Sequence, residues 1–359
     1  MSTPRRTLVI AEAGVNHNGS LDRALWLVDA AAAAGADAVK FQTFTAAKVA
    51  SRLAPKAAYQ VARTPGTRDQ VAMLEQLELS RDAHHTLAAH CRAAGIEFMS
   101  TAFDEGSLDF LVDEIGVTRV KIPSGEITNA PYLLHAAGWG LPVLLSTGMS
   151  ELDEVELALG VLAAGFTAAS SRTLESFAAA RASTAGLRAL RDRVTVLQCT
   201  SLYPAPPGQV NLLAMDTLAS ATGLPVGYSD HTLGIAVATA AVARGAVVIE
   251  KHLTLDRTLP GPDHYASIEP AAFADLVAAI RTVEQALGSC EKIPSADELL
   301  NRPAARRSLV AACDIPQGSR FDATNVTVKR PGTGISPLHY WEWLGKVAEH
   351  NYDKDDLLR

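Results

Sequence analysis

Short runs of apolar and β-branched residues alternate with longer amphipathic stretches rich in Ala and Leu along most of the chain. The short runs predict β-strands, and the spacing of apolar positions in the longer stretches predicts helices. The predicted strands span 7–14, 38–44, 97–102, 119–123, 142–147, 194–200, 225–229 and 247–253. The helix that follows each strand spans 20–34, 82–94, 105–115, 130–138, 151–164, 209–222, 234–244 and 271–287.

Eight strand–helix units within roughly 290 residues predict an α/β fold, a closed parallel (β/α)8 TIM barrel. The competing fold is an open, doubly wound sheet, which usually has fewer units and a Gly-rich nucleotide turn. No GxGxxG follows the first predicted strand, which favours the barrel. Ser20 and Ser80 stand where helix N-caps are expected, and Gly95 stands where the second helix should end.

Two stretches interrupt the alternation, and a segment of different composition follows it. Residues 45–79 form a long excursion after the second strand, and residues 164–190 form an Ala/Ser/Arg-rich insertion expected to be helical or loose. We expect a barrel domain over 1–287, a charged linker over 288–303 and a small β-rich domain over 304–359. A domain this small has a thin core and is expected to lean on a partner surface.

Composition excludes several classes of function. The net charge of −7 argues against a nucleic-acid binder, which needs a basic face. Four scattered cysteines without a CxxC pair argue against a disulfide framework and favour a cytoplasmic location. No uncharged apolar run approaches the ~20 residues that a membrane helix requires, and Glu12 interrupts the only stretch that resembles a signal peptide. We therefore expect no membrane and no nucleic-acid partner.

Polar side chains follow the apolar stem of every predicted strand. The carboxyl ends of the strands line the active site in TIM barrels, so these residues are candidates for one site. They include Glu12, Lys40, Gln42, Thr101, Lys121, Ser124, Glu126, Ser146, Ser201, Tyr203, Ser229, His231 and His252.

Lys40 and Lys121 lie inside predicted strands, where an unpaired ammonium would be costly. Each lysine either forms an ion pair, with Glu12 or Glu126, or belongs to a site for phosphate and carboxylate groups. In the second case nearby hydroxyls serve as further donors.

His231 and His252 end two neighbouring strands and could bind a divalent metal with positions left open for substrate. Glu12 or a substrate oxygen would complete such a site. The alternative is a pair of hydrogen-bonded core histidines. We expect His84, His85 and His90, which share one predicted helix, at the surface, and Cys199 as a packing residue.

Several stretches resemble the sialic acid synthases, which make nine-carbon 2-keto acids from phosphoenolpyruvate. They include IAEAGVNHNGSLDRA, AGADAVKFQTF, EFMSTAFDEGSLDFL, VKIPSGEITNAPYL, PVLLSTGMS, LQCTSLYPAP, VGYSDHTLG and EKHLTLDRTLPGPDH. Near the end, VKRPGTGI resembles the family's antifreeze-like SAF domain. The resemblance spans nearly the whole chain.

The resemblance implies a metal-dependent, aldol-type condensation of phosphoenolpyruvate with an open-chain, N-acetylmannosamine-like aldehyde sugar. Phosphate would be released by C–O cleavage. The expected metal ion is Mn2+, with Mg2+ and Co2+ as alternatives. The expected assembly is a domain-swapped homodimer. Glu12, Lys40, Lys121, His231 and His252 would be catalytic, the two histidines as metal ligands. Phosphoenolpyruvate would be held by Lys40, Thr101, Lys121, Ser124, Ser146 and Ser229.

The sugar would contact Gln42, Glu126, Tyr203 and Asp263, and Arg330 would reach into the barrel of a second subunit. Members that make N-acetylneuraminate commonly carry Asn at the position of Ser201, so the acceptor stays open between N-acetylmannosamine, a 2,4-diacetamido hexose and a specialised-metabolite aldehyde. Two other readings also remain: a class I aldolase with Lys40 or Lys121 as Schiff base, and a catalytically inactive binding protein.

Overall fold

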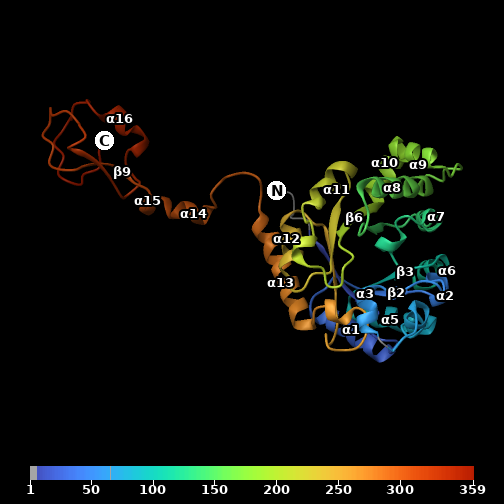
Figure 1. The fold of residues 1–359 in the computed structure, drawn as a ribbon. Coiled ribbons are helices and arrows are strands. Elements are labelled where there is room, and N and C mark those ends of the chain that lie inside the picture. The colour runs from blue at the N-terminus through green and yellow to red at the C-terminus, as the bar shows by residue number, and fades with distance from the viewer. Residues whose placement is uncertain (1–5, 65) are drawn as a thin grey trace. The chain divides into compact units, whose positions relative to one another are not determined.

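The barrel expected from the sequence is present in the computed structural model, which describes residues 6–64 and 66–359 (Figure 1). Within these residues, eight parallel strands pair in chain order, and β8 closes the barrel against β1. Every strand lies within one residue of its predicted bounds. The strands are β1 (Leu8–Gly14), β2 (Ala38–Thr43), β3 (Glu97–Ala102), β4 (Val120–Ile122), β5 (Val143–Ser146), β6 (Val194–Cys199), β7 (Val226–Asp230) and β8 (Val248–His252).

A helix follows each strand and covers the outside of the barrel. These helices are α1 (Leu21–Ala33), α5 (Arg81–Ala94), α6 (Glu105–Phe110), α7 (Ala130–Gly138), α8 (Leu152–Phe166), α11 (Ala214–Thr222), α12 (Ala236–Ala243) and α13 (Pro270–Leu287). The Ser20 and Ser80 hydroxyls accept N-cap hydrogen bonds, and Gly95 ends α5 with φ +71°.

Two predicted helices differ in detail. The stretch 105–115 is α6 followed by a π-helical turn, Leu111–Ile115. The stretch 209–222 contains only α11, because the prolines that precede it hold the chain in a loop and a short 3-10 helix, Pro207–Gln209.

The two interruptions are both helical. The excursion over 45–79 contains three short helices, α2 (Ala46–Val49), α3 (Ala58–Arg63) and α4 (Gln70–Glu75). The insertion forms α9 (Leu174–Ala182) and α10 (Thr184–Arg193), which pack against α8. Gly160 of α8 permits this packing, since a Cβ there would lie 2.7 Å from the Phe177 carbonyl oxygen.

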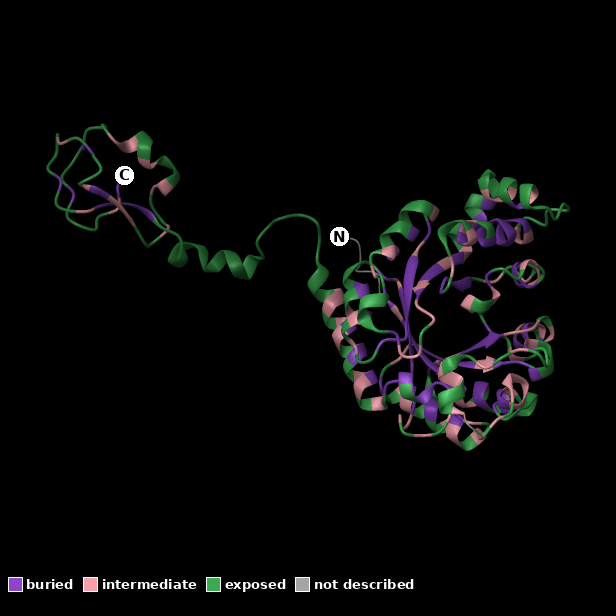
Figure 2. Ribbon diagram, in the orientation of Figure 1, coloured by how far each residue is buried: buried purple, intermediate pink, exposed green. Residues whose placement is uncertain are grey.

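The inside of the barrel is built in layers, and its strands are buried (Figure 2). The lower layer is an apolar cluster of Ile10, Ala38, Met99, Leu144, Leu197 and Val248. Gly227 completes this layer, because a Cβ there would lie 2.6 Å from Leu197 Cδ2. Side chains alternate along a strand, so the residues two positions further on face the same interior. Those residues are polar, and they form the floor of the site described below.

The chain divides into two compact units, Met1–Gly288 and Ser289–Arg359. The second unit contains α14 (Ala296–Leu300), α15 (Arg302–Ala305), the antiparallel pair β9 (Ser308–Ala311) and β10 (Val326–Lys329), and α16 (Tyr340–Trp343). Its β character consists of this pair and isolated bridges such as Ile315↔Tyr352. Trp343 packs on its core, while Trp341 is 78% exposed. None of the described helices combines the length and the hydropathy needed to cross a membrane.

Candidate active site

Polar side chains from all eight strand ends meet in a cavity of about 520 Å3. Of the residues expected at the site, all but Glu126 and Arg330 line it. The lining includes Glu12, Lys40, Gln42, Thr101, Lys121, Ser124, Ser146, Ser201, Tyr203, Ser229, His231, His252 and Asp263. The prediction that the strand ends converge is therefore supported by the geometry, while the roles of the individual residues remain predictions.

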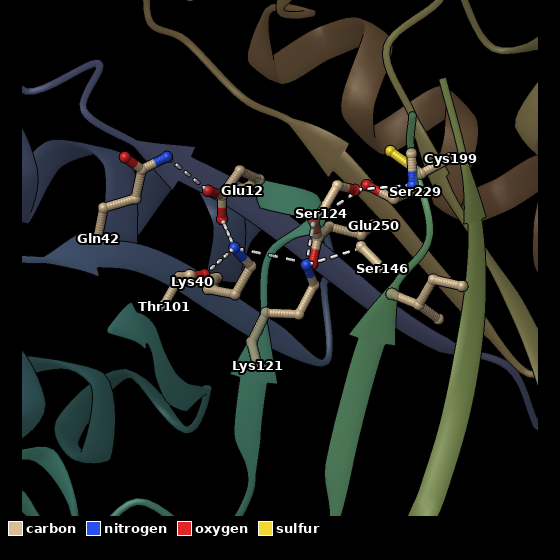
Figure 3. Close-up of polar contacts among 12 residues, drawn as sticks. Glu12, Lys40, Gln42, Thr101, Lys121, Ser124, Ser146, Cys199, Ser229 and Glu250 are labelled. Atoms are coloured by element: carbon tan, nitrogen blue, oxygen red, sulfur yellow. Dashed lines mark hydrogen bonds and ion pairs between the residues drawn. The ribbon is translucent and has the colours of Figure 1, made fainter. Parts of the chain in front are cut away.

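Lys40 is the centre of one half of the floor. Its ammonium lies 2.5 Å from Glu12 Oε2 and donates a 2.7 Å hydrogen bond to Thr101 Oγ1 (Figure 3). Glu250 Oε2 lies 3.7 Å away. All four side chains are buried. The ion-pair reading of Lys40 is correct, and it is compatible with an anion site, because an incoming anion can compete for the ammonium.

Lys121 is the centre of the other half. Its ammonium donates to Ser146 Oγ at 2.9 Å and lies 3.7 Å from Glu250 Oε1. Ser229 donates to the same carboxylate oxygen at 3.1 Å. One carboxylate therefore lies between the two lysines, as Figure 3 shows.

Glu250 lies at the end of the eighth predicted strand, but no role in the site was assigned to it from the sequence. A usable signal was the alternation in β8, where Val248 faces the barrel interior and the residue two positions on must face it too. The prediction offered Glu12 or Glu126 as the ion-pair partner of each lysine, but Glu126 accepts a 2.6 Å hydrogen bond from Asn129 Nδ2 instead. The choice between the two glutamates depends on side-chain placement around the barrel.

The charges of the floor shift one another's pKa. Burial raises the pKa of Glu12 to about 7, although Lys40 opposes the shift. Burial alone would lower the pKa of Lys40, but Glu12 and Glu250 outweigh it and raise that pKa. For Lys121 burial prevails and the pKa falls. Burial alone would raise the pKa of Glu250, but Lys121 and Lys40 hold it below its usual value.

His231 and His252 face one another with ring centroids 5.4 Å apart. His231 Nδ1 lies 2.7 Å from the Thr200 carbonyl oxygen, an acceptor, so this nitrogen carries the proton and Nε2 is left as a potential ligand. His252 Nδ1 is buried and has no hydrogen-bond partner among the described residues. Burial and the neighbouring His231 hold the pKa of His252 well below its usual value. A neutral imidazole with an unused nitrogen suits a metal ion.

No group of three or more His, Cys, Asp or Glu side chains within 6–64 and 66–359 is arranged to hold a metal. The completion of the ligand set by Glu12 or by a substrate oxygen stays a prediction. The donors fit an ion held by two imidazoles, with its other positions open to substrate and water.

Aromatic rings cover the histidines. Tyr203 lies 4.1 Å from His231 between ring centroids, and Tyr59 of α3 stacks on Tyr203 at 5.0 Å. Asp263, from the loop after β8, is buried beside them, and burial raises its pKa to about 6. The excursion over 45–79 thus supplies part of the mouth of the cavity.

Two glycines allow close approach at the floor. A Cβ at Gly14, where φ is +51°, would lie 3.3 Å from Glu12 Oε1 and 3.4 Å from Gln42 Nε2. A Cβ at Gly148 would lie 2.3 Å from Ser201 Oγ. The Gly148 N–H instead donates to Ser124 Oγ at 2.8 Å, which orients that hydroxyl.

Comparison with known proteins agrees with this geometry. Residues 27–292 match the model of the NeuB family, and residues 306–359 match the SAF domain. The chain belongs to the NeuB family. It is 46% identical to an N,N'-diacetyllegionaminic acid synthase of Campylobacter jejuni, with 99% of both chains covered. It is 49% identical to the protein of the same name from Legionella pneumophila, with 98% of this chain and 92% of the relative covered.

A solved structure is similar to this NeuB-family chain over most of its length. It is an N-acetylneuraminic acid (sialic acid) synthetase from Leptospira borgpetersenii in complex with citrate. The TM-score is 0.67 at 33% sequence identity, and 83% of this chain and 90% of that chain are covered. The resemblance to the sialic acid synthases expected from the motifs is confirmed.

Three expectations about side chains of this NeuB-family chain need correction or completion. His84 is buried rather than at the surface, and its Nε2 lies 2.8 Å from Thr43 Oγ1. Cys199 packs in the interior, as expected, but its Sγ also contacts His231 Nδ1 at 3.8 Å. Arg330 is exposed on the second unit, and its role in the cavity of another subunit stays a prediction.

Proposed function

We propose that this chain condenses phosphoenolpyruvate with the open-chain aldehyde of an acetamido sugar. The products are a nine-carbon 2-keto sugar acid and inorganic phosphate. The observation that carries the proposal is the floor of the cavity, where two buried lysines are surrounded by hydroxyls and lie beside a histidine pair. The names of the similar proteins, legionaminic and sialic acid synthases, support the same reaction class.

The floor suits an anion with two charged ends. Lys40 with Thr101, and Lys121 with Ser146, present two ammonium–hydroxyl pairs. Ser124 and Ser229 add two further hydroxyls to the lining of the cavity. In phosphoenolpyruvate the same carbon, C2, carries the carboxylate and the oxygen that is esterified with phosphate. Charge-assisted hydrogen bonds recognise both anionic groups. Burial of the floor strengthens each of these contacts.

The reaction then proceeds in balanced steps. C3 of phosphoenolpyruvate forms a bond to the aldehyde carbon, and the aldehyde oxygen takes up a proton. Water adds at C2, and the tetrahedral intermediate breaks its C–O bond to phosphate, which leaves a 2-keto group. Lys40 and Lys121 stabilise the charge that collects on the leaving phosphate. Glu12, whose pKa burial raises to about 7, is suited to orient the water and accept its proton.

We also propose that His231 and His252 hold a divalent ion, with Mn2+ as the expected species and Mg2+ or Co2+ as alternatives. When bound, the ion supplies Lewis-acid polarisation of the aldehyde oxygen. The unused His252 nitrogen and the hydrogen bond that fixes His231 support this assignment. Gln42, Tyr203 and Asp263 line the cavity where the sugar would extend from its aldehyde end.

The assembly we propose is a homodimer in which Arg330 enters the cavity of the partner subunit. Support comes from the second unit, where Leu338 is 86% and Trp341 is 78% exposed next to the segment that carries Arg330. Large exposed apolar side chains mark surfaces that are covered in an assembly. We place the enzyme in the cytoplasm, where the four free cysteines would stay reduced.

The test is phosphate release from phosphoenolpyruvate in the presence of Mn2+ and an acetamido sugar aldehyde. We expect release to depend on the sugar, to stop with EDTA, and to fall at least about 1,000-fold in Lys40→Met. A class I aldolase would instead be trapped by borohydride with pyruvate and would tolerate EDTA. An inactive binding protein would release no phosphate with any sugar.

A further inference from the structure

A loop over residues 253–268 follows β8 and carries Asp263 to the lining of the cavity. The two ends of the loop lie side by side, since the Thr254 N–H donates to the Ile268 carbonyl oxygen at 3.0 Å. Asp263 is 7% exposed, and no hydrogen bond from the described residues reaches its carboxylate oxygens. Burial of an acceptor without a donor is unfavourable, so this carboxylate is suited to a ligand that supplies a hydroxyl or an N–H.

Asn16 joins this loop to β1. It stands two residues beyond the end of β1 and is 1% exposed. Its Nδ2 donates to the Leu253 carbonyl oxygen at 2.8 Å and to Ser267 Oγ at 2.9 Å, so both amide protons are used. Leu253 and Ser267 lie near opposite ends of the loop. One buried side chain therefore holds both ends of the loop in place.

Ser267 extends this constraint to Asp263. The Ser267 hydroxyl donates to the Asp263 carbonyl oxygen at 2.7 Å, and the Ser267 N–H donates to the same oxygen at 3.2 Å. The Ala266 N–H is a third donor to that oxygen, at 3.1 Å. The backbone of Asp263 is thus fixed relative to Asn16, and the direction in which the carboxylate leaves the loop is fixed with it.

Asn18 joins the same loop to the barrel near its middle. Its Nδ2 donates to the Pro260 carbonyl oxygen at 2.8 Å, and its Oδ1 lies 3.2 Å from His264 Nε2. Gly261 permits this approach, since its φ is +144° and a Cβ there would lie 2.8 Å from Asn18 Oδ1. The contacts of the segment after β1 therefore reach the loop on both sides of Asp263.

We propose that Asn16 is a positioning residue, which holds the loop so that the Asp263 carboxylate keeps one place in the cavity and accepts a hydrogen bond from the acceptor sugar there. The proposal rests on the proposed function, and it concerns how the site is held rather than which sugar is used. A misplacement of about 1 Å in a group that orients a substrate can cost about 100-fold in rate. Phosphoenolpyruvate contacts the floor instead, so its binding does not depend on the loop.

A double-mutant cycle with Asn16→Ala and Asp263→Ala tests the proposal. Phosphate release is measured with phosphoenolpyruvate, Mn2+ and either N-acetylmannosamine or a 2,4-diacetamido hexose, whichever the unmodified protein uses better. We expect Asn16→Ala to lower kcat/KM for the sugar at least about 10-fold and to change KM for phosphoenolpyruvate less than about twofold. In the Asp263→Ala background we expect the same substitution to cost less than about twofold, because the group that Asn16 positions is gone.

Two further variants complete the cycle. Ser267→Ala removes the hydroxyl that links Asn16 to Asp263, and we expect it to show the same dependence on the background. Thr7→Val is the matched control, since it removes a buried hydrogen bond from Thr7 Oγ1 to the Ala246 carbonyl oxygen at the opposite end of β1. We expect Thr7→Val to leave kcat/KM for the sugar unchanged.

Equal losses from Asn16→Ala in the two backgrounds, with the variants folded by circular dichroism, would contradict the inference. A loss no larger than that of Thr7→Val would contradict it too. In both cases the unmodified protein still releases phosphate, and the proposed function stands. If the unmodified protein releases phosphate with neither sugar, the proposed function is wrong and the inference falls with it. If Asn16→Ala does not fold, Ser267→Ala in the two backgrounds decides the question.

Discussion

Glu250 balances the charge of the floor, since it lies 3.7 Å from both Lys40 and Lys121. Without it, two buried ammonium groups would face one another with only Glu12 to compensate. A bound anion can take over this balance, which links the stability of the barrel to the presence of phosphoenolpyruvate.

We expect Glu250→Gln to lower the free energy of unfolding by about 3 kcal/mol, because it leaves a buried charge without its partner. Phosphoenolpyruvate should raise the free energy of unfolding by more in the variant than in the unmodified protein. Urea unfolding at pH 7, with and without phosphoenolpyruvate, measures both effects. As a control, Glu114→Gln breaks an exposed pair with Arg81 and should cost less than about 1 kcal/mol. Equal losses in the two variants would contradict the account of the floor.

A buried histidine near the mouth should make stability depend on pH. Burial lowers the pKa of His264 from 6.5 to about 4. Arg23 adds a smaller shift in the same direction, and Asp256 opposes it. The folded state therefore holds this group unprotonated at a pH where the unfolded chain protonates it. Its contribution to stability is present above pH 6.5 and is lost as the pH falls toward 4.

His264→Gln should accordingly flatten the dependence of the free energy of unfolding on pH between 6.5 and 4. Urea unfolding at several pH values in that window tests this, with His85→Gln, whose side chain on α5 is 48% exposed, as the control. A variant with the same slope as the unmodified protein would contradict the assignment.

At the level of residues, the sequence predicted which positions collect at the site, because alternation within a strand decides which side chains face the barrel interior. It could not predict which charges pair. Lys121 lies beside Glu250 rather than Glu126, and that choice depends on how side chains from separate strands extend within the closed barrel. His84 was misplaced for a similar reason: it lies on a polar-looking stretch of α5, yet faces Thr43 of β2.

At the level of elements, β7 and β8 are joined by an ion pair on the faces opposite the floor. Lys251 Nζ lies 2.7 Å from Asp230 Oδ2 and donates to the Thr232 carbonyl oxygen at 2.6 Å. Both charged side chains are fully buried. Asp230 immediately precedes His231, and Lys251 immediately precedes His252, so the pair fixes the relative position of the two proposed metal ligands.

We expect Lys251→Met to weaken Mn2+ binding at least about 10-fold, because partners behind metal ligands orient them. Isothermal titration of metal-stripped protein measures the affinity, and thermal unfolding without metal shows whether the variant is folded. Lys329→Met, which breaks the exposed pair with Asp355 in the second unit, is the matched control. A folded Lys251→Met protein with unchanged affinity would show that the pair does not position the histidines.

The barrel strands were predictable at the level of elements because buried parallel strands are short, apolar runs with clear ends. The excursion over 45–79 was predicted only as an interruption. Its helices α2, α3 and α4 have four to six residues each, too few for an apolar period to be recognised. Their places are fixed instead by contacts with distant residues, such as Tyr59 with Tyr203.

At the scale of the whole molecule, Arg330 is the one predicted site residue that belongs to the second unit and not to the barrel unit. Arg330 is exposed and stands next to Pro331 and Gly332 in the segment that resembles the SAF domain. The proposed dimer would place it in the cavity of the other subunit. The sequence could suggest this arrangement only through the family resemblance, because contact between copies leaves no periodic pattern in one chain.

Mixing two inactive variants tests this arrangement. Lys40→Met has a defective floor and an intact Arg330, whereas Arg330→Ala has an intact floor. If Arg330 acts in the partner's cavity, refolding the two together should restore about a quarter of the unmodified activity, since half of the dimers are mixed and each has one complete site. Activity that stays at the level of the separate variants would exclude the exchange.

The fate of oxygen tests the central claim that the floor holds phosphoenolpyruvate for condensation with C–O cleavage. The reaction is run in water enriched in 18O with an acceptor sugar, and the phosphate is examined by mass spectrometry. We predict phosphate without solvent oxygen, because the bond between carbon and the bridging oxygen breaks and water attacks C2. Phosphate that carries 18O would show that water attacks phosphorus, and the proposed chemistry of Lys40, Lys121 and Glu12 would then be wrong.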